Sequence, residues 1–219
     1  MSEQVSVCKI DNPFKSYSKD RAEFYSEQIQ AFKDTGAPTE AVEVIDVFLF
    51  NRSGEFLVQK RSSTKNHNPD LLDKTIGGHI QFGDQPYYTT MIESVQELQT
   101  PSIVLHTKDE FSKTYTLLKG YLDTIAVILY HDVKLVSIPR IIKNEKITIA
   151  NKMHLFFGIY GGATKPVDRE AKGVLLYSFE EIEKEIVKNT DSFTDDFIYL
   201  FNTYKQDIRQ FIDILVDKQ

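Results

Sequence analysis

Residues 77–101 read GGHIQFGDQPYYTTMIESVQELQTP, and this stretch decides how the rest of the chain is interpreted. Pro86 suits the first turn of a helix and Pro101 marks its end, so the sequence predicts a helix over 86–99. The helical period gathers its apolar side chains into one stripe, which is expected to pack on the core: Tyr87, Met91, Val95 and Leu98.

The same period places Glu93, Gln96 and Glu97 roughly opposite the apolar stripe. Glu93 and Glu97 are four residues apart, so their carboxylates share one face and repel each other unless a cation lies between them. Hard divalent cations such as Mg²⁺ bind carboxylates of this kind together with water and phosphate oxygens. Periodicity alone favours an ordinary solvated face. A structure that placed Glu93 and Glu97 against the core, or that made 86–99 a strand, would contradict the whole interpretation of the chain.

The residues around this helix shift the interpretation toward a metal site. From Gly78 the chain offers Asp84 at the sixth position and then IESVQELQT at 92–100, a spacing that resembles the Nudix box of diphosphate hydrolases. The flanks, DVFLFNRSGEFLVQKRS and HLFFGIYGG, also look like parts of that family, and the resemblance covers about residues 42–188. It implies that Glu93, Glu97 and the Gly78 backbone hold Mg²⁺ or Mn²⁺, with Glu97 as the principal ligand.

The box departs from the family pattern at four positions. Ile92 stands in place of an arginine, and Gln96 replaces one carboxylate. Asp84 is one methylene shorter than glutamate, and Gln99 stands where a glycine normally ends the helix in the left-handed conformation. Changes in groups that orient metal ligands cost about 10–100-fold in affinity or activity. These departures therefore predict weakened metal binding.

The remaining apolar runs predict an α+β fold, a Nudix-like α/β/α sandwich around a mixed sheet. Two β-like runs around Ser53 and Gly54 read as a hairpin. Strands are expected at 41–50, 55–61, 124–138, 146–150, 154–162 and 173–179, and helices at 19–34, 86–99, 108–120, 179–188 and 195–216. The 219 residues are expected to form a single domain, with an N-terminal helical extension at 1–40, a core at 42–188 and a C-terminal helix at 190–219.

Four further residues are candidates for the site. Arg61 and Lys65 could contact a diphosphate, because Arg offers a bidentate fork and Lys a point charge. The resemblance implies a ligand-contacting role for His79 and a catalytic or metal-binding role for Glu170. The alternative for Arg61, Lys65 and Glu170 is ordinary solvated charge, and for His79 a structural role in the loop.

A narrower resemblance concerns the flanks of the box. QKRSSTKNHNPD at 59–70 and TIGGHIQFGD at 75–84 are similar to the isopentenyl diphosphate isomerase branch of Nudix proteins. Those isomerases carry a catalytic cysteine just before the Gly-His pair, and Gly77 stands there in this chain. Cys8 is the only thiol, so isomerase activity is the less favoured interpretation.

The composition of the chain limits the kinds of partner that it is expected to bind. The net charge of −6 provides no overall attraction to nucleic acid or to an anionic membrane. A single cysteine excludes an internal disulfide and a cysteine-based zinc cage. The first residues do not read as a signal peptide, and no apolar run approaches the ~18 residues of a membrane span. We expect a cytoplasmic protein with a small-molecule diphosphate as its partner.

Two functional hypotheses remain open from the sequence. The first is a divalent-metal-dependent hydrolase of a nucleoside diphosphate linked to another moiety. The second is an inactive Nudix-fold module that binds or senses a nucleotide. Residues 195–216 also carry a broad apolar stripe, which is expected to pack on the chain's own core; a homodimer interface is the alternative.

Overall fold

A mixed sheet organises the chain, and the computed structural model describes it over residues 3–65, 67–142, 145–164 and 171–216. The main path of the sheet runs β10 (Ala171–Tyr177), β4 (Phe56–Arg61), β3 (Glu40–Phe50), β9 (Glu145–Ile159), β8 (Ala126–Ile142) and β7 (Ser102–Leu105). β3 is parallel to β9 and β7 is parallel to β8, whereas the other neighbours on this path are antiparallel. The expected runs at 146–150 and 154–162 are thus one strand, β9.

Strand β3 is the centre of this sheet. One of its edges pairs with β9, and the other pairs in turn with β1 (Gln4–Lys9), β6 (Ile76–His79) and β4. All its residues are buried, as its run of β-branched and aromatic side chains predicts. The short strand β5 (Leu72–Asp73) pairs with β4. β6 is therefore held against the middle of the sheet, and it carries the glycines of residues 77–78.

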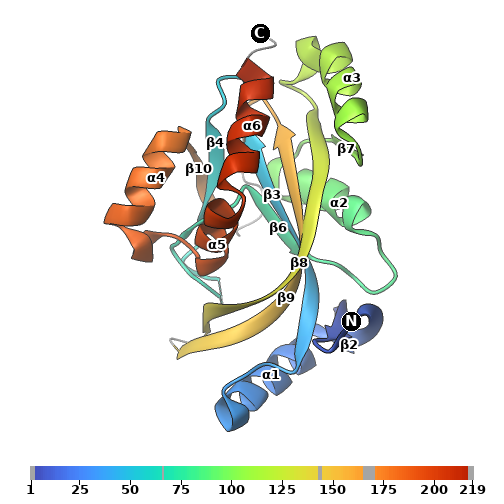
Figure 1. Cartoon of the computed structure of the whole chain (residues 1–219), viewed down its shortest axis with the longest axis vertical. Helices are drawn as coiled ribbons and strands as arrows, with labels where there is room; N and C mark the ends of the chain where they lie inside the picture. The colour runs from blue at the N-terminus through green and yellow to red at the C-terminus, as the bar shows by residue number, and fades with distance from the viewer. Residues whose placement is uncertain (1–2, 66, 143–144, 165–170, 217–219) are drawn as a thin grey trace.

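Helices cover both faces of the sheet (Figure 1). The described residues form α1 (Arg21–Thr35), α2 (Pro86–Leu98), α3 (Lys108–Leu118), α4 (Phe179–Lys188), α5 (Asp195–Thr203) and α6 (Lys205–Val216), with short 3₁₀ turns at Lys119–Tyr121 and Thr190–Ser192. In Figure 1, α4, α5 and α6 lie on one side and α2 and α3 on the other. The predicted α+β sandwich is confirmed. Across these ranges, no helix is long and apolar enough to span a membrane.

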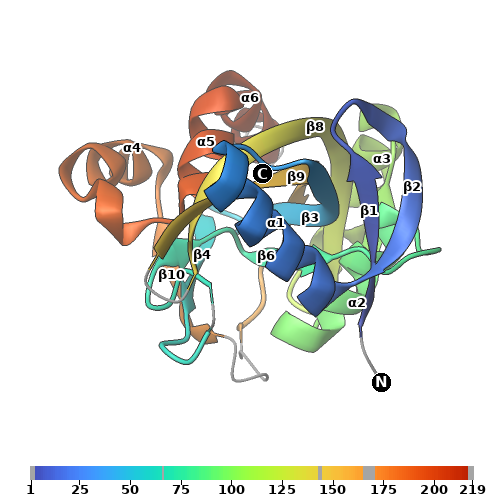
Figure 2. The ribbon, with the colours of Figure 1, turned by 90° about the horizontal axis from the view of Figure 1, so that it is seen from below.

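The N-terminal segment differs from the expected helical extension. Before α1 it forms an antiparallel pair, β1 and β2 (Asn12–Asp20), and β1 continues the sheet beside β3. Ion pairs of 2.7 Å join Glu40 of β3 to Lys9 and to Lys19. β2 is largely polar and exposed, whereas β1 buries Val5 and Val7 in the main hydrophobic cluster but is only six residues long. Figure 2 shows α1 beside the sheet, below β3 and β9.

The C-terminal stripe packs inside the chain. The single helix expected at 195–216 is divided at Tyr204 into α5 and α6. The buried side chains of the two helices belong to the main hydrophobic cluster: Phe197, Leu200, Phe201, Tyr204, Ile208, Phe211 and Leu215. The expected packing on the chain's own core is confirmed, so this stripe is not available as a dimer interface. A homodimer through another surface stays a prediction.

Helix α2 packs on the sheet through the face that was predicted to be exposed to solvent. Tyr87, Met91 and Val95 are 41%, 41% and 52% exposed, whereas Glu97 is only 4% exposed. The predicted packing of the apolar stripe is wrong except for Leu98. The prediction that the carboxylates face away from the core is wrong for Glu97, whereas Glu93 is half-buried. Two small residues explain why the polar face can be buried. The hydroxyls of Thr90 and Ser94 donate to backbone oxygens one turn earlier, at 2.9 and 2.7 Å, so they need no partner outside the helix.

Gln99 ends this helix in a conformation that glycine adopts more readily. Its φ is 53° and its ψ is 31°, and the N–H of Thr100 donates back to the Ser94 oxygen at 3.2 Å. The left-handed conformation costs an L-residue roughly 1–2 kcal/mol.

We expect Gln99→Gly to raise the free energy of unfolding by about 0.5–1 kcal/mol, because the relief of strain exceeds the extra chain entropy of glycine. Urea unfolding measures the change. Gln99→Ala serves as the control, since it removes the side chain and keeps the strain. A glycine variant less stable than the alanine variant would show that strain at residue 99 is not limiting.

Candidate functional site

A cleft of about 1340 Å³ lies where the box loop, α1, α2 and β8 meet. It is lined by residues of these elements, of β3 and of the loop after β4. Gly77, Gly78 and His79 enter it from β6, and Glu93 and Gln96 enter it from α2. The box loop and the box helix therefore face each other in the same cleft.

Glu93 lies directly against Gly78. A Cβ atom built on Gly78 would come within 2.4 Å of the Glu93 Oε1 atom and 2.7 Å of its Cδ. Any side chain at residue 78 would force the Glu93 side chain to shift from this position. Two of the predicted metal-binding groups, the Glu93 side chain and the Gly78 backbone, are thus brought together, although they are 15 residues apart in the sequence.

We expect Gly78→Ala to lower the free energy of unfolding by about 1–3 kcal/mol, because the new methyl group overlaps the Glu93 carboxylate. Gly173→Ala is the matched control: it also lies in a strand, and a Cβ there meets no atom within 4 Å. Thermal or urea unfolding of the two variants provides the comparison. Equal stability of the two would show that Glu93 can move away freely.

Glu97 occupies a different position from Glu93. Its side chain is buried between α2 and β4, and its Oε2 atom accepts a hydrogen bond from Gln59 Nε2 at 3.2 Å. The residues that line the cleft include Glu93 and do not include Glu97. The role of principal metal ligand, predicted for Glu97, therefore suits Glu93 better.

The donor set fits a divalent ion that is shared with a bound ligand. In the part of the chain that the structure describes, no group of three or more His, Cys, Asp or Glu side chains could hold a metal ion. A cage made only of protein groups is therefore not formed by those residues. Mg²⁺ usually binds through one or two carboxylates together with water and substrate phosphates. Glu93 beside the Gly78 backbone is a donor set of that smaller kind.

Arg61 is engaged with its own loop. Its Nη1 donates to Asp73 Oδ2 at 2.8 Å, its Nε to the Asn68 oxygen at 3.0 Å and its Nη2 to the His67 oxygen at 2.8 Å. The guanidinium therefore shapes one wall of the cleft. Contact with a diphosphate stays a prediction for Arg61, as it does for Lys65, which also lines the cleft. Glu170, the remaining catalytic candidate, lies outside the described residues.

His79 is bonded to the N-terminal helix. Its Nε2 lies 2.8 Å from the hydroxyl of Tyr25 in α1. Burial lowers the pKa of His79 well below its usual value, and the nearby positive charges of Arg21 and Arg140 lower it further. Burial and the charge of Arg140 also lower the pKa of His67 to about 4. Both imidazoles are therefore neutral near pH 7.

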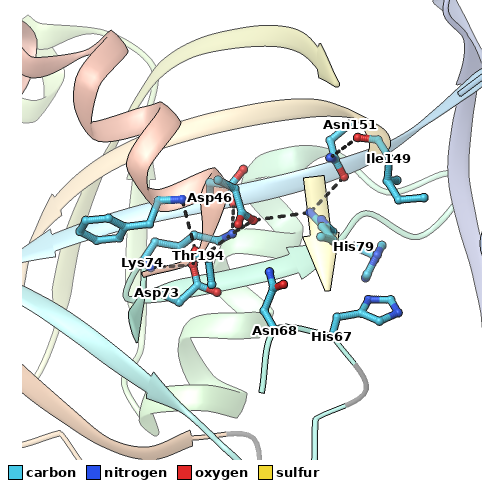
Figure 3. Close-up of polar contacts among 12 residues, drawn as sticks. Asp46, His67, Asn68, Asp73, Lys74, His79, Ile149, Asn151 and Thr194 are labelled. Carbon is cyan, nitrogen blue, oxygen red and sulfur yellow. Dashed lines mark hydrogen bonds and ion pairs between the residues drawn. The ribbon is translucent and has the colours of Figure 1, made fainter. Parts of the chain in front are cut away.

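A buried group of charges lies beside these histidines (Figure 3). Lys74 Nζ is 2.7 Å from Asp46 Oδ1, 2.7 Å from Asp196 Oδ2 and 3.4 Å from Asp73 Oδ1. Arg140 Nη2 is 3.5 Å from Asp196 Oδ2. We call these five residues the charge cluster. All five line the cleft and are at most 9% exposed.

The charges of the cluster set one another's ionisation. Burial acts to lower the pKa of Lys74, but the carboxylates of Asp196, Asp46 and Asp73 raise it above its usual value. Burial acts to raise the pKa of Asp196, but Lys74 and Arg140 lower it. For Asp46, burial prevails and raises the pKa. Lys74 is therefore the charge that keeps this group of carboxylates in the interior.

The sequence interpretation missed Tyr25, Arg140 and the charge cluster. A signal did exist for Asp46, a charged residue in the middle of the apolar run AVEVIDVFLF. Asp196 lies in the first turn of α5, where a negative charge is favourable in any helix, so its sequence context gives no separate signal. Nothing in the local sequence connects Lys74 with Asp196, which is 122 residues away.

Comparisons with known proteins return solved structures alone. No family model matches the chain, and no curated protein sequence does. A Nudix-family hydrolase of Clostridium perfringens is 14% identical, with a TM-score of 0.45 over 81% of this chain and 97% of its own. The MutT protein of Methanosarcina mazei is also 14% identical, with a TM-score of 0.46 over 79% and 93% of the two chains.

A third similar structure is a bifunctional NMN adenylyltransferase/ADP ribose pyrophosphatase of Francisella tularensis, complexed with AMP and a Mn ion. It is 11% identical, with a TM-score of 0.49 over 85% of this chain and 47% of its own. Nudix hydrolases are thus among the structures to which this chain is similar in fold. What the chain does has to be argued from its own cleft.

Proposed function

We propose that the chain is a Nudix-type hydrolase that requires Mg²⁺ or Mn²⁺ and cleaves a nucleoside diphosphate linked to another moiety. The observation that carries this proposal is the contact between Glu93 and Gly78. It joins the glycine loop to the carboxylate-bearing helix inside a cleft large enough for such a ligand. The spacing of the box in the sequence supports the same function.

Glu93 is the residue on which the chemistry depends. Its carboxylate, with the backbone of Gly78 beside it, would hold a divalent ion together with the phosphate oxygens of the ligand. When bound, the ion would neutralise charge on the phosphates and lower the pKa of an attacking water. Glu97 keeps α2 in register with β4 through Gln59 and so holds Glu93 in place. The wall shaped by Arg61 limits the space in which the ligand lies.

A second candidate function is a binding module without turnover. The positive charges in the cleft favour it, because Arg61 is paired with Asp73 and Lys74 with Asp46 and Asp196. Such paired cations have less capacity to stabilise charge that develops during hydrolysis. Gln96 also favours a binding module, because this neutral amide lines the cleft where the family pattern has a carboxylate.

No cysteine is among the residues that line the cleft, so the catalytic thiol of the isomerases has no counterpart there. Cys8 is buried in a small cluster with Ala41 and Ala150, and it is not among the residues that line the cleft. Gly77, which stands in the position of the isomerase cysteine, does line it. We therefore favour hydrolysis or binding of a diphosphate over its isomerisation.

One experiment separates the two candidates. A panel of nucleoside diphosphate derivatives is incubated with the protein and Mn²⁺, and formation of the nucleoside monophosphate is measured by chromatography beside thermal-shift binding of the same compounds. Metal-dependent formation of this product supports the hydrolase. Stabilisation by a compound that is not cleaved supports the binding module. If no compound is cleaved and no compound stabilises the protein, both candidates are overturned.

A further inference from the structure

Tyr25 links the N-terminal helix to the box loop. It lies on the buried face of α1 with Phe24 and Gln28. The helix is fixed at both ends: Asp20 accepts a hydrogen bond from the Glu23 N–H at 3.0 Å, and Gly36 caps the other end with a φ of 78°. Both ends of α1 are therefore capped, and Tyr25 on this helix is one of the residues that line the cleft.

The hydroxyl of Tyr25 has two partners of different kinds. Arg140 Nη1 lies 3.3 Å from it, and a guanidinium can only donate, so the Tyr25 oxygen is an acceptor in this contact. His79 Nε2 lies 2.8 Å from the same hydroxyl. If the Tyr25 O–H donates to His79 Nε2, its hydrogen has a partner, whereas in the opposite direction it would have none among the described residues. The pair is therefore assigned with Tyr25 as the donor.

This direction fixes the state of the His79 ring. A ring nitrogen that accepts a hydrogen bond carries no hydrogen, so the proton of the neutral imidazole resides on Nδ1. A doubly protonated ring would place a second positive charge beside the buried Arg140, which is 9% exposed. His79 lines the cleft beside Gly78, and Nδ1 has no hydrogen-bond partner among the residues described.

We infer that Tyr25 is a positioning residue that holds His79 in its Nδ1–H tautomer, so that this N–H can donate a hydrogen bond to a phosphate oxygen in the cleft. The ligand class rests on the proposed function, whereas the tautomer does not. Because Nε2 is occupied by Tyr25, His79 serves as a hydrogen-bond donor to the ligand and not as a metal ligand through that nitrogen. The N-terminal segment, which lies outside the box, thereby contributes to the site.

The test combines a spectroscopic and a binding measurement on the full chain. Ring ¹⁵N chemical shifts report which nitrogen of His79 is protonated, and the spectrum of His79→Gln assigns the signal among the 5 histidines. Tyr25→Phe removes the hydroxyl and keeps the ring that contacts Phe24 and His67. Tyr115→Phe is the matched control, because it removes another buried hydroxyl, bonded to the Leu215 oxygen at 3.3 Å.

In the wild-type protein we expect His79 to carry its proton on Nδ1. In Tyr25→Phe we expect a mixture of tautomers and a roughly fivefold weaker affinity for inorganic pyrophosphate, the loss of about one hydrogen bond. The control variant should change neither. A wild-type ring protonated on Nε2, or a Tyr25→Phe variant with the wild-type tautomer and affinity, would overturn the inference. If the wild-type protein binds no pyrophosphate, the proposed ligand class is wrong, and the tautomer alone decides the role of Tyr25.

Discussion

Replacement of Lys74 by methionine is expected to lower the free energy of unfolding by about 3–5 kcal/mol, the usual cost of removing one partner from a buried ion pair. The ammonium group lies 2.7 Å from both Asp46 and Asp196, and among the described residues no other lysine is paired with either. Methionine fills a similar volume, so little of the loss arises from a cavity. Most of it arises from carboxylates left in the interior with one cation fewer.

The pH dependence of the stability of Lys74→Met shows whether the loss arises from the charge of the buried carboxylates. Without Lys74, the pKa of Asp46 in the folded state, which burial already raises, should rise further, and the pKa of Asp196 should rise because its main lowering charge is lost. The folded state then binds more protons than the unfolded state as the pH falls, so its stability relative to the wild type increases. The deficit in Lys74→Met should be largest near pH 7 and smaller near pH 5. Urea unfolding at the two pH values measures it.

A surface lysine provides the control for this prediction. Lys113 pairs with Asp109 at 2.6 Å, but the two side chains are 72% and 73% exposed. Lys113→Met should therefore change the stability by less than about 0.5 kcal/mol at either pH. A Lys74→Met variant that behaves like this control would mean that the charge cluster is already neutralised by protons or water.

The central sheet was accessible from the sequence because its signal is local. The run 41–50 is apolar and rich in β-branched residues, and such a run predicts a strand wherever both faces are covered. The structure shows this strand as Glu40–Phe50. β2 was missed because a strand at the margin of a sheet needs only backbone pairing, which polar sequences also provide. β1 was missed although Val5 and Val7 are buried, because its apolar alternation covers only a few residues.

The orientation of α2 could not be read from its periodicity. An apolar stripe predicts the buried face only if the opposite face has no better partners in the folded chain. Here Glu97 meets Gln59 and Glu93 meets Gly78, and both partners are distant in the sequence. The small side chains of Thr90 and Ser94 allow that polar face to approach the sheet. The box spacing indicated which glutamates are important, whereas the helical pattern assigned them to the wrong side.

The walls of the cleft could not be predicted from local sequence patterns either, because they come from segments that are distant in the sequence. These walls combine α1, β6 and β8, whose nearness depends on the pairing of β3 with both β6 and β9. The box alone predicts Gly78 and Glu93 as neighbours. Tyr25 and Arg140 enter only when the tertiary structure is known, because their contacts span 115 residues.

Glu93→Gln is expected to lower the rate of Mn²⁺-dependent hydrolysis by at least about 100-fold, the usual contribution of a carboxylate that serves as a general base or metal ligand. The substitution preserves the size of the side chain, so the contact with Gly78 remains. Glu97→Gln should affect stability more than metal binding, because Glu97 is buried, is not among the residues that line the cleft and accepts a hydrogen bond from Gln59. Rates of nucleoside monophosphate formation and Mn²⁺ titration calorimetry of the two variants distinguish these roles.

The control for Glu93→Gln is the same change at Glu145, which also lines the cleft but is paired with Lys33 at 2.7 Å and is 58% exposed in its side chain. Glu145→Gln should keep the wild-type rate and Mn²⁺ affinity. Gln96→Glu tests the site in the opposite direction. Two opposite unit charges about 4 Å apart attract each other by about 1 kcal/mol in water, and a divalent ion doubles this attraction. Gln96→Glu is therefore expected to tighten Mn²⁺ binding by at least about tenfold. If Glu93→Gln keeps full activity, or if Gln96→Glu leaves Mn²⁺ affinity unchanged, the ion does not bind at this face of α2.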